Sequence, residues 1–220
     1  MNVKVYEQQE KYIKECVHFL TANASDNSNI ALSGGSTPLK IYQALAADSS
    51  FPIEEINFFQ TDERYVPPED QESNFKLITE SLFKNRKPKS FTHFDTKLPI
   101  EECADEYENN IKDISFQITL LGIGTDGHTA SLFPSSPALE QTKRLAVHTD
   151  TDNFAIKDRL TITFPQILKS KKLLVLLEGP KKHRILSILT NSLPDKKRDI
   201  SNFPALKLLE HEDLNLFYLI

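Results

Sequence analysis

The 220-residue sequence predicts an α/β fold, a single domain in which helices cover both faces of a doubly wound, mostly parallel sheet. Two observations predict this fold. Short apolar runs alternate along the chain with segments whose apolar residues recur at helical spacing. A hydrophobic content of 39% is enough to bury a substantial core, and no internal repeat or low-complexity tract interrupts the pattern. We therefore expect one domain over residues 1–220.

The expected elements follow from the length and period of each apolar segment. Short apolar runs bounded by polar or turn-forming residues are predicted to be strands, and longer segments with a period near 3.6 are predicted to be helices. The expected strands are Val3–Tyr6, Ile30–Ser33, Ile56–Gln60, Phe116–Leu121, Leu145–His148, Leu160–Thr163, Leu173–Leu177 and Leu216–Ile220. The expected helices are Gln8–Thr21, Pro38–Ala46, Ser73–Phe83, Ile100–Lys112, Pro165–Lys169, Lys181–Thr190 and Ala205–Leu209.

Charge and cysteine content restrict the classes of function. The net charge is −5 and the basic residues are scattered, so we expect no nucleic-acid partner. Cys16 and Cys103 form no C-x-x-C pair and the histidines have no zinc-ligand spacing, so we expect a reducing compartment and no metal. The N-terminus lacks the apolar core of a signal peptide and no apolar run has the length of a membrane span, which predicts a cytoplasmic protein without a membrane partner.

Four distinctive segments follow predicted strands. They are SGGSTP from Ser33, TDER from Thr61, GIGTDGH from Gly122 and EGPKK from Glu178. The carboxyl ends of parallel strands lie at one edge of a sheet, where doubly wound proteins bind their ligands. We therefore expect these four segments to share one pocket.

The segment SGGSTP is typical of a tight turn from a strand into a helix. Ser36 or Thr37 can cap the helix, and Pro38 suits its first position. Such a helix start binds anions such as phosphate through free N–H groups and the positive end of the helix dipole. A well-capped structural turn explains the same residues, and no Gly-Lys-Ser/Thr follows to make a P-loop.

The segment TDER places charged side chains at the end of an apolar strand. Such a cluster is costly unless it is paired or solvated. One interpretation is an ion pair between Asp62 and Arg64 that holds the loop. The other is that Arg64 binds a phosphate through its planar guanidinium while Asp62 orients a substrate hydroxyl.

The segment GIGTDGHTASLFP begins with G-x-G-x-x-G, the pattern of a dinucleotide-binding loop, and Asp150 lies downstream where a ribose-binding carboxylate belongs. That pattern must open a long helix, whereas Pro134 and Pro137 leave room for only a turn or two. The remaining interpretation is a flexible loop that presents Asp126 and His128, with the His as general acid or base. A His that caps the next short helix is the structural alternative.

The segment EGPKK places Lys181 and Lys182 at a predicted helix start. Lysines there oppose the helix dipole, which is locally unfavourable. Contact with an anion would explain them, and so would a solvated surface pair.

Taken together, SGGSTP, TDERYVP with SN further on, GIGTDGHTASLFP, RLTITFPQI and EGPKK resemble, in order and spacing, the motifs of the 6-phosphogluconolactonase family. The related glucosamine-6-phosphate deaminases share Gly-x-Asp-Gly-His, but they continue with Ile-Ala-Phe-Asn-Glu and have Asp-Glu-Tyr where this chain has Asp62-Glu63-Arg64. The resemblance implies the fold of the glucosamine-6-phosphate isomerase superfamily and hydrolysis of 6-phospho-D-glucono-1,5-lactone. It also implies no cofactor, a phosphorylated sugar lactone as the small-molecule partner, and a monomer or homodimer.

The resemblance also assigns roles to residues of this chain. His128 would be the base that activates water, and Asp126 would orient it. The implied substrate-binding residues are Gly34, Gly35, Ser36, Thr37, Asp62, Arg64, Gly124, Arg159 and Lys182, with the phosphate on Arg64, Lys182 and Arg159. The chain departs from the family at TDTDNFAIKDR, where Ser-Pro-Lys-Pro-Pro is common, and at Glu178, where Thr is usual.

Two other functions stay open on the sequence alone. One is a sugar-phosphate deaminase or isomerase in which Asp62 abstracts a proton. The other is a non-catalytic binder of a sugar phosphate or dinucleotide.

Overall fold

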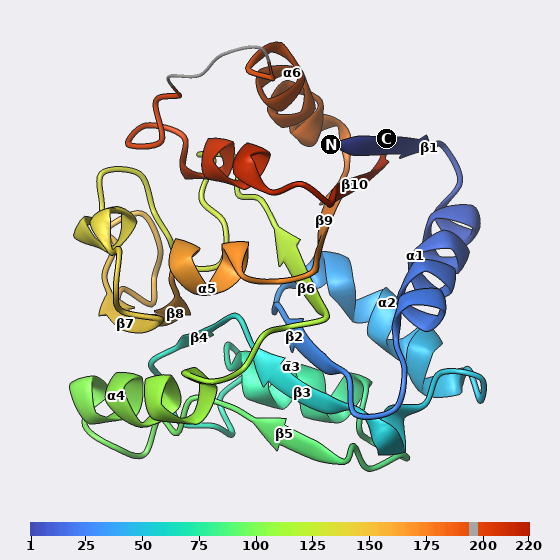
Figure 1. Ribbon diagram of the computed structural model, residues 1–220, viewed down its shortest axis with the longest axis horizontal. Coiled ribbons are helices and arrows are strands. Elements are labelled where there is room, and N and C mark those ends of the chain that lie inside the picture. Colours follow the sequence, from blue (N-terminus) through green and yellow to red (C-terminus); the bar gives the residue numbers. More distant parts are fainter. Residues whose placement is uncertain (194–197) are drawn as a thin grey trace.

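The computed structural model describes residues 1–193 and 198–220 and has a seven-stranded parallel sheet at its centre (Figure 1). Every neighbouring pair in this sheet is parallel, in the order β1-β10-β9-β6-β2-β3-β5. Its strands are β1 (Asn2–Tyr6), β2 (Asn29–Leu32), β3 (Asn57–Gln60), β5 (Ser90–Thr92), β6 (Ile118–Gly122), β9 (Lys172–Glu178) and β10 (Leu214–Leu219). This architecture confirms the predicted fold class.

A second, three-stranded antiparallel sheet lies beside the main one. It consists of β4 (Asp62–Arg64), β8 (Arg159–Ile162) and β7 (Ala146–Thr149), with β8 in the middle. The sequence predicted strands near β7 and β8 but did not separate them from the main sheet. It missed β4 and β5, because β4 is a short charged segment only one residue beyond β3, and β5 is equally short and only partly buried.

Helices cover both faces of the main sheet, as predicted. The buried side chains of α1 (Gln9–Asn23), α2 (Ser36–Ala47) and α3 (Asn74–Ser81) belong to one apolar cluster. Those of α4 (Ile100–Ile111), α5 (Phe164–Leu168) and α6 (His183–Asn191) belong to the other, which also includes the small sheet. Figure 1 shows α1 and α2 on one side of the sheet and α5 with β7 and β8 on the other.

The described residues also form four 3₁₀ segments, at Ile53–Glu55, Pro137–Glu140, Pro180–Lys182 and Pro204–Glu210. Two of them correct the predicted helices. The segment predicted as a helix over Ala205–Leu209 is 3₁₀, and the one predicted from Lys181 becomes α-helical only at His183. In the described part of the chain, no helix is both long and apolar enough to span a bilayer.

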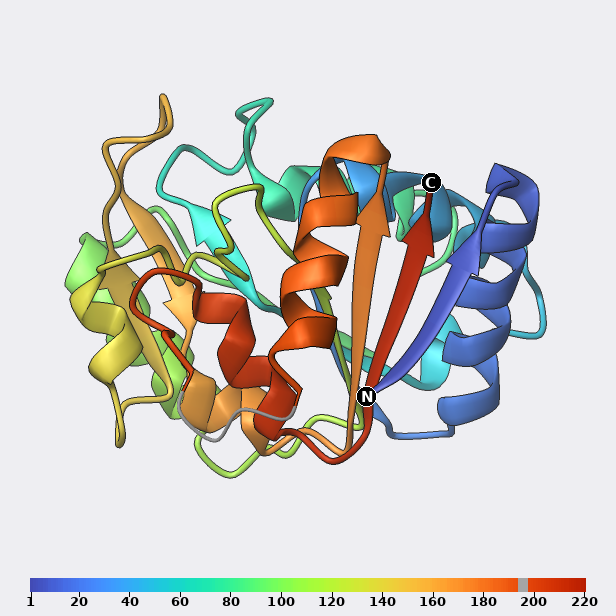
Figure 2. The same cartoon turned by 90° about the horizontal axis from the view of Figure 1, so that it is seen from above.

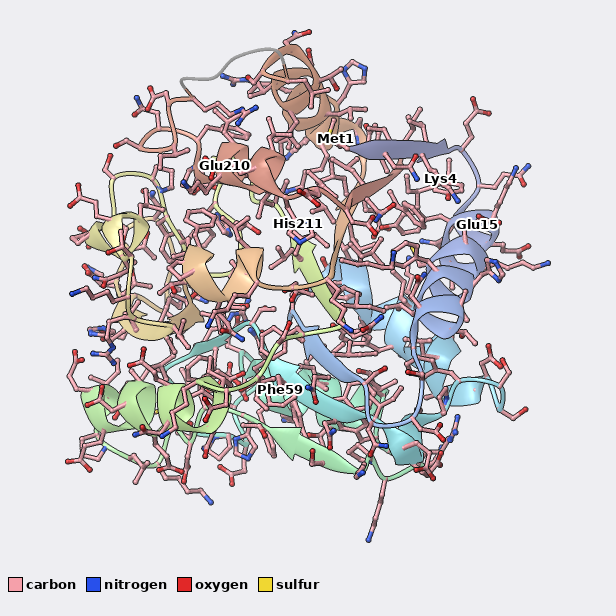
Figure 3. The ribbon with its side chains drawn as sticks, in the orientation of Figure 1. Met1, Lys4, Glu15, Phe59, Glu210 and His211 are labelled. Atoms are coloured by element: carbon pink, nitrogen blue, oxygen red, sulfur yellow. The ribbon has the colours of Figure 1, made fainter. Side chains whose placement is uncertain are left out.

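Successive side chains of the central strands point to opposite faces of the sheet, so the apolar core has one part on each face. The Phe58 ring is buried in the cluster under α1 to α3, whereas that of its neighbour Phe59 is buried in the opposite cluster. Because both faces are covered, the strands appear in the sequence as continuous apolar runs. At the sheet edge, the Lys4 ammonium on β1 lies 3.5 Å from the Glu15 carboxylate on α1 (Figure 3).

The order of the strands determines where a ligand site can form. From β2 the chain winds outward through β3 and β5, and from β6 it winds the other way through β9 and β10. The winding direction therefore reverses between β2 and β6, and ligands of doubly wound folds bind at this point, beyond the carboxyl ends of the strands. Figure 2 shows the arrowheads of β9 and β10 pointing to one common edge of the sheet.

Candidate active site

A cavity of about 240 Å³ opens at the reversal point between β2 and β6. Most of the predicted site residues line it, namely Gly34, Gly35, Ser36, Thr37, Asp62, Arg64, Gly124, His128 and Arg159. The residues that sequence reasoning did not assign to the site are Ser33, Pro38, Asn74, Gly122, Ile123, Ala130, Ser131, Phe133 and Phe154. Asp126 and Lys182 do not line the cavity, but each contacts a residue that does.

The loop after β6 brings Asp126 and His128 together. The Asp126 Oδ1 atom lies 2.6 Å from His128 Nδ1 and also accepts the backbone N–H of His128 at 3.2 Å. Burial opposes ionisation of Asp126, but its hydrogen bond with His128 and the charge of that imidazole hold its pKa below the usual range. Whenever the imidazole is in its neutral form, an ionised Asp126 makes Nδ1 the nitrogen that carries the proton. The Nε2 atom is then left as a proton acceptor.

The glycines of this loop allow the imidazole and the carboxylate to approach the backbone. A Cβ atom at Gly124 would lie 2.2 Å from the His128 ring and 2.5 Å from Asp126 Oδ1. Gly127 adopts φ +90°, which favours glycine. No helix follows them before Pro137, so the described loop lacks the helix start of a dinucleotide site, as Pro134 predicted. The helix that His128 could have capped is absent there too.

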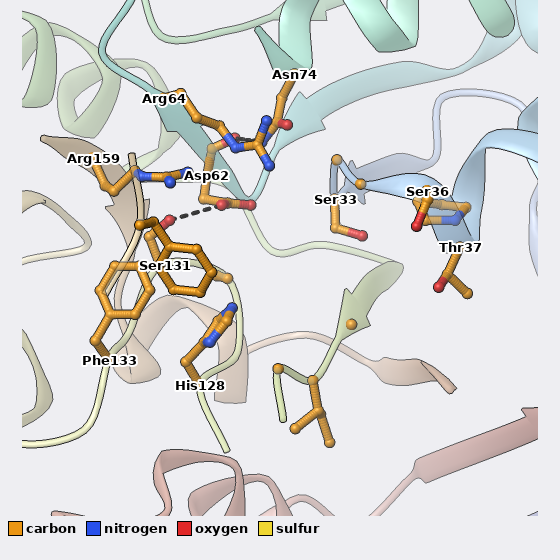
Figure 4. A pocket seen from close by; sticks show the side chains of 18 residues that line it. Ser33, Ser36, Thr37, Asp62, Arg64, Asn74, His128, Ser131, Phe133 and Arg159 are labelled. Atoms are coloured by element: carbon orange, nitrogen blue, oxygen red, sulfur yellow. Dashed lines mark hydrogen bonds between the residues drawn. The ribbon is translucent and has the colours of Figure 1, made fainter. Parts of the chain in front are cut away.

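Two arginines lie side by side on the small sheet. The antiparallel register pairs Arg64 on β4 with Arg159 on β8, and Figure 4 shows both guanidinium groups beside Asp62. Burial, followed by the positive charge of Arg64, lowers the pKa of Arg159. Arg159 Nε donates to the Ile156 carbonyl at 2.9 Å. Within residues 1–193 and 198–220 its guanidinium forms no direct ion pair, although the charges of Asp62, Glu63 and Glu72 act on it. An anion bound here would relieve the repulsion between two guanidinium groups.

Arg64 also contacts Glu72, and the ion pair with Asp62 that the sequence allowed is not formed. The Arg64 guanidinium donates to the Glu72 carbonyl and lies 3.6 Å from its carboxylate. Asp62 instead accepts a hydrogen bond from Thr61 Oγ1 at 3.0 Å. It accepts another from Ser131 Oγ at 2.8 Å, which Figure 4 shows as a dashed line. These two hydroxyls fix the carboxylate in the cavity wall.

Glu63, the charged residue between Asp62 and Arg64, has a structural role. Its side chain is 1% exposed and accepts the backbone N–H groups of Asn74 and Phe75 at 2.7 and 2.6 Å, at the start of α3. Burial raises the pKa of this carboxyl, and the hydrogen bonds offset part of the rise. Asn74 Nδ2 donates to the Asp62 carbonyl, and its Oδ1 lies 1.8 Å from where a Cβ of residue 34 would be, so Gly34 is required for close packing.

The start of α2 differs from the predicted cap. The helix begins at Ser36, the residue before it is Gly35 with φ +97°, and no side chain caps it. Ser36 and Thr37 are therefore within the first turn, and Pro38 is its third residue. The first N–H groups of α2 remain free of a side-chain partner at the cavity, where the positive end of the helix dipole adds to them.

Lys182, rather than Lys181, is directed toward the site. Its ammonium donates to the carbonyl of Ile123, which lines the cavity, whereas Lys181 is exposed. Burial lowers the pKa of the Lys182 ammonium, and the charge of Asp126 offsets part of this shift.

Comparison with known proteins agrees with this geometry. The sequence model of the family described as glucosamine-6-phosphate isomerases/6-phosphogluconolactonase matches residues 3–215. This chain belongs to that family. Among the described residues of this member, no three His, Cys, Asp or Glu side chains form a group that could hold a metal ion.

Relatives in the family extend over most of both chains. A probable 6-phosphogluconolactonase of Dictyostelium discoideum is 36% identical over 96% of this chain and 94% of its own length. A 6-phosphogluconolactonase of Thermotoga maritima is 36% identical over 86% of this chain and 83% of its own. The crystal structure of 6-phosphogluconolactonase from Thermotoga maritima superposes with a TM-score of 0.85 and 29% identity, covering 99% of this chain and 98% of that one.

The two departures from the family motifs have different positions in the structure. Glu178 lies beside α1 and α2, where it accepts from Gln9 Nε2 at 3.4 Å and lies 3.9 Å from Lys40 Nζ, and it does not line the cavity. The TDTDNFAIKDR segment connects β7 to β8 and contributes Phe154 to the cavity wall. The departing loop is therefore part of the site, and Glu178 is not.

Proposed function

We propose that this chain hydrolyses 6-phospho-D-glucono-1,5-lactone to 6-phosphogluconate, the second step of the oxidative pentose phosphate pathway. The observation that carries the proposal is one cavity that holds both an Asp126-oriented imidazole and a pair of arginines. The relatives named 6-phosphogluconolactonase support it through identity over most of the chain. We further propose a cytoplasmic enzyme that is a monomer or a homodimer.

The phosphate binds to the arginine pair. Planar guanidinium groups form charge-assisted hydrogen bonds with phosphate oxygens, and the low exposure of Arg159 strengthens them. Lys182 adds a positive charge from the Ile123 side of the cavity. Anchoring the phosphate places the lactone carbonyl near His128 and replaces a bimolecular encounter by a fixed geometry.

His128 acts as the general base. Its Nε2 atom takes a proton from water while the water oxygen forms a bond to the lactone carbonyl carbon. Ionised Asp126 stabilises the resulting imidazolium. The tetrahedral intermediate then collapses, the bond from the carbonyl carbon to the ring oxygen breaks, and the imidazolium returns its proton to that oxygen as it becomes a hydroxyl.

The first turn of α2 stabilises the oxyanion of the intermediate. Its N–H groups at Ser36 and Thr37 have no side-chain cap, and both residues line the cavity. Donors fixed before the reaction stabilise developing negative charge without reorganisation. The carboxylate of Asp62, held by Ser131 and Thr61, is left to orient a substrate hydroxyl.

The wall beside His128 favours lactone hydrolysis over deamination. The deaminase motif Ile-Ala-Phe-Asn-Glu would place a Glu at position 133, where this chain has Phe. The centroid of the Phe133 ring lies 5.0 Å from that of the His128 imidazole, so an apolar ring stands where the deaminase motif has a carboxyl group.

The test is hydrolysis of freshly prepared 6-phosphogluconolactone, corrected for spontaneous opening. We expect turnover that saturates with the phosphorylated lactone, and no ammonia release from glucosamine 6-phosphate. In a thermal-shift comparison, 6-phosphogluconate raises the melting temperature and NADP does not. Ammonia release without lactone hydrolysis would assign the deaminase function instead.

A further inference from the structure

The loop between β7 and β8 contributes Phe154 to the cavity wall. The backbone N–H of Thr151 donates to the Lys157 carbonyl at 3.2 Å, and Lys157 Nζ lies 2.6 Å from Asp152 Oδ1. The carbonyl of Asp158 accepts from the Tyr65 N–H at 3.0 Å, which ties the loop to the end of β4. These contacts define a closed hairpin loop that carries Phe154 at the cavity.

The Phe154 ring contacts both functional parts of the cavity. Its centroid lies 5.5 Å from that of the His128 ring, at an interplanar angle of 84°, and 5.7 Å from the Arg159 guanidinium carbon. A third contact, 5.7 Å between centroids, joins it to Phe133. Yet its side chain remains 41% exposed, so one part of the ring is available to a bound molecule.

We propose that Phe154 is a specificity-determining residue that recognises the six-membered ring of the substrate. The proposal rests on the proposed function for the orientation of the substrate, with the phosphate at Arg159 and the carbonyl at His128. Phe154 is within reach of a molecule that extends from one to the other, because its ring lies beside both. The C–H groups on one face of a sugar ring form an apolar surface that packs against an aromatic ring, as apolar pocket walls do in general.

Other residues already hold the His128 imidazole in place, so Phe154 is not needed for that purpose. Asp126 fixes Nδ1 at 2.6 Å, and Phe133 packs against the imidazole with ring centroids 5.0 Å apart. Arg159 is likewise held through Nε by the Ile156 carbonyl. Loss of the Phe154 ring therefore weakens substrate binding and leaves the base in place.

The experiment compares Phe154→Ala, Phe154→Leu and Phe154→Tyr with the wild-type chain. We expect Phe154→Ala to raise the KM for the lactone, and the Kd for glucose 6-phosphate, which carries a six-membered ring, by about three- to tenfold, the scale of one aromatic contact. kcat and the Kd for inorganic phosphate stay within about twofold. Phe154→Leu is intermediate, and Phe154→Tyr restores binding because it restores the ring.

Leu193→Ala is the matched control, because Leu193 is also 41% exposed but does not line the cavity. It should change none of these values. Calorimetric binding of glucose 6-phosphate also separates the proposed lactonase function from the proposed role of Phe154. If the chain does not hydrolyse the lactone but its binding of glucose 6-phosphate depends on Phe154, only the lactonase function is contradicted.

Four results would overturn the inference. A fall in kcat with unchanged KM would show that Phe154 positions the His128 imidazole and does not bind the substrate. Equal losses of affinity for glucose 6-phosphate and inorganic phosphate would show that Phe154 acts by positioning Arg159. Wild-type binding in Phe154→Ala, or no binding of glucose 6-phosphate to the wild-type chain, would remove ring recognition altogether.

Discussion

The two sides of the cavity are built in different ways. On one side, Gly34 to Thr37, Gly124 and His128 follow central strands of the parallel sheet; we call this the main-sheet side. On the other, Asp62, Arg64 and Arg159 belong to the antiparallel sheet; we call this the small-sheet side. The main-sheet side offers a proton acceptor and free helix N–H groups, whereas the small-sheet side offers two guanidinium groups. The difference supports the proposal that the main-sheet side supplies the general base and the small-sheet side supplies two arginines for the phosphate. Lys182, which follows β9, adds a positive charge from the main-sheet side.

The largest expected effect tests the main-sheet side. His128→Ala should lower kcat by about 10²- to 10⁴-fold, the contribution of a general base, with little change in KM. Steady-state kinetics on the freshly made lactone measures this. Because the imidazole lies at the surface of the cavity, the melting temperature should stay near that of the wild-type chain. An active His128→Ala enzyme would remove the base assignment.

The second prediction concerns the small-sheet side. Arg64→Ala and Arg159→Ala should each raise KM by about ten- to a hundredfold, because each removes charge-assisted bonds to the phosphate, while kcat changes less. The control is Arg86→Ala, which removes an arginine paired with Glu54 away from the cavity. If kcat fell and KM stayed constant, the two sides would not be separate in function.

The third prediction tests the close approach at Gly124. A Cβ there meets the His128 ring at 2.2 Å, so Gly124→Ala should displace the imidazole and lower kcat by about tenfold or more. Gly122→Ala is the control at the same strand end. Its Cβ also lies at the cavity but meets no atom within 4 Å, so His128 should keep its position and kcat should fall less than in Gly124→Ala. Equal kcat values for the two variants would show that the position of His128 does not depend on Gly124.

The smallest expected effect concerns Lys182. Burial lowers its pKa, so its ammonium loses its proton at a lower pH than an ordinary lysine, whose pKa is about 10.4. The positive charge is present below the lowered pKa and is lost as pH rises through it. Calorimetric titration with 6-phosphogluconate should therefore show affinity that weakens by about threefold toward alkaline pH. Lys182→Arg should remove this dependence, and an unchanged profile in that variant would exclude Lys182 as its source.

Sequence reasoning predicted the main-sheet side better than the small-sheet side. Asp126 and His128 are separated by one residue and follow a long apolar strand, so their proximity is a local property. The contact between Arg64 and Arg159 depends on pairing of two strands far apart in the sequence. The β4 strand has no apolar pattern, because its three residues are all charged.

Other residues of the site left weaker signals. Ser131 lies in the recognised GIGTDGHTASLFP segment, but its bond to Asp62 follows from the tertiary fold. Phe154 occupies the segment that departs from the family motif, so the resemblance gave it no role. The sequence predicted that the second helix begins at Pro38, because Ser and Thr are good caps. The helix begins at Ser36 instead, and the residue before it is Gly35, which has no side chain to cap it.

The central claim is that His128 serves the reaction while the arginines bind the phosphate. The most direct test measures binding of the product, which involves no turnover. Calorimetry with 6-phosphogluconate would compare His128→Ala and Arg159→Ala with the wild-type chain. We predict that His128→Ala binds within about twofold of wild type, whereas Arg159→Ala loses about tenfold or more. Wild-type affinity in Arg159→Ala, together with lost affinity in His128→Ala, would contradict the account.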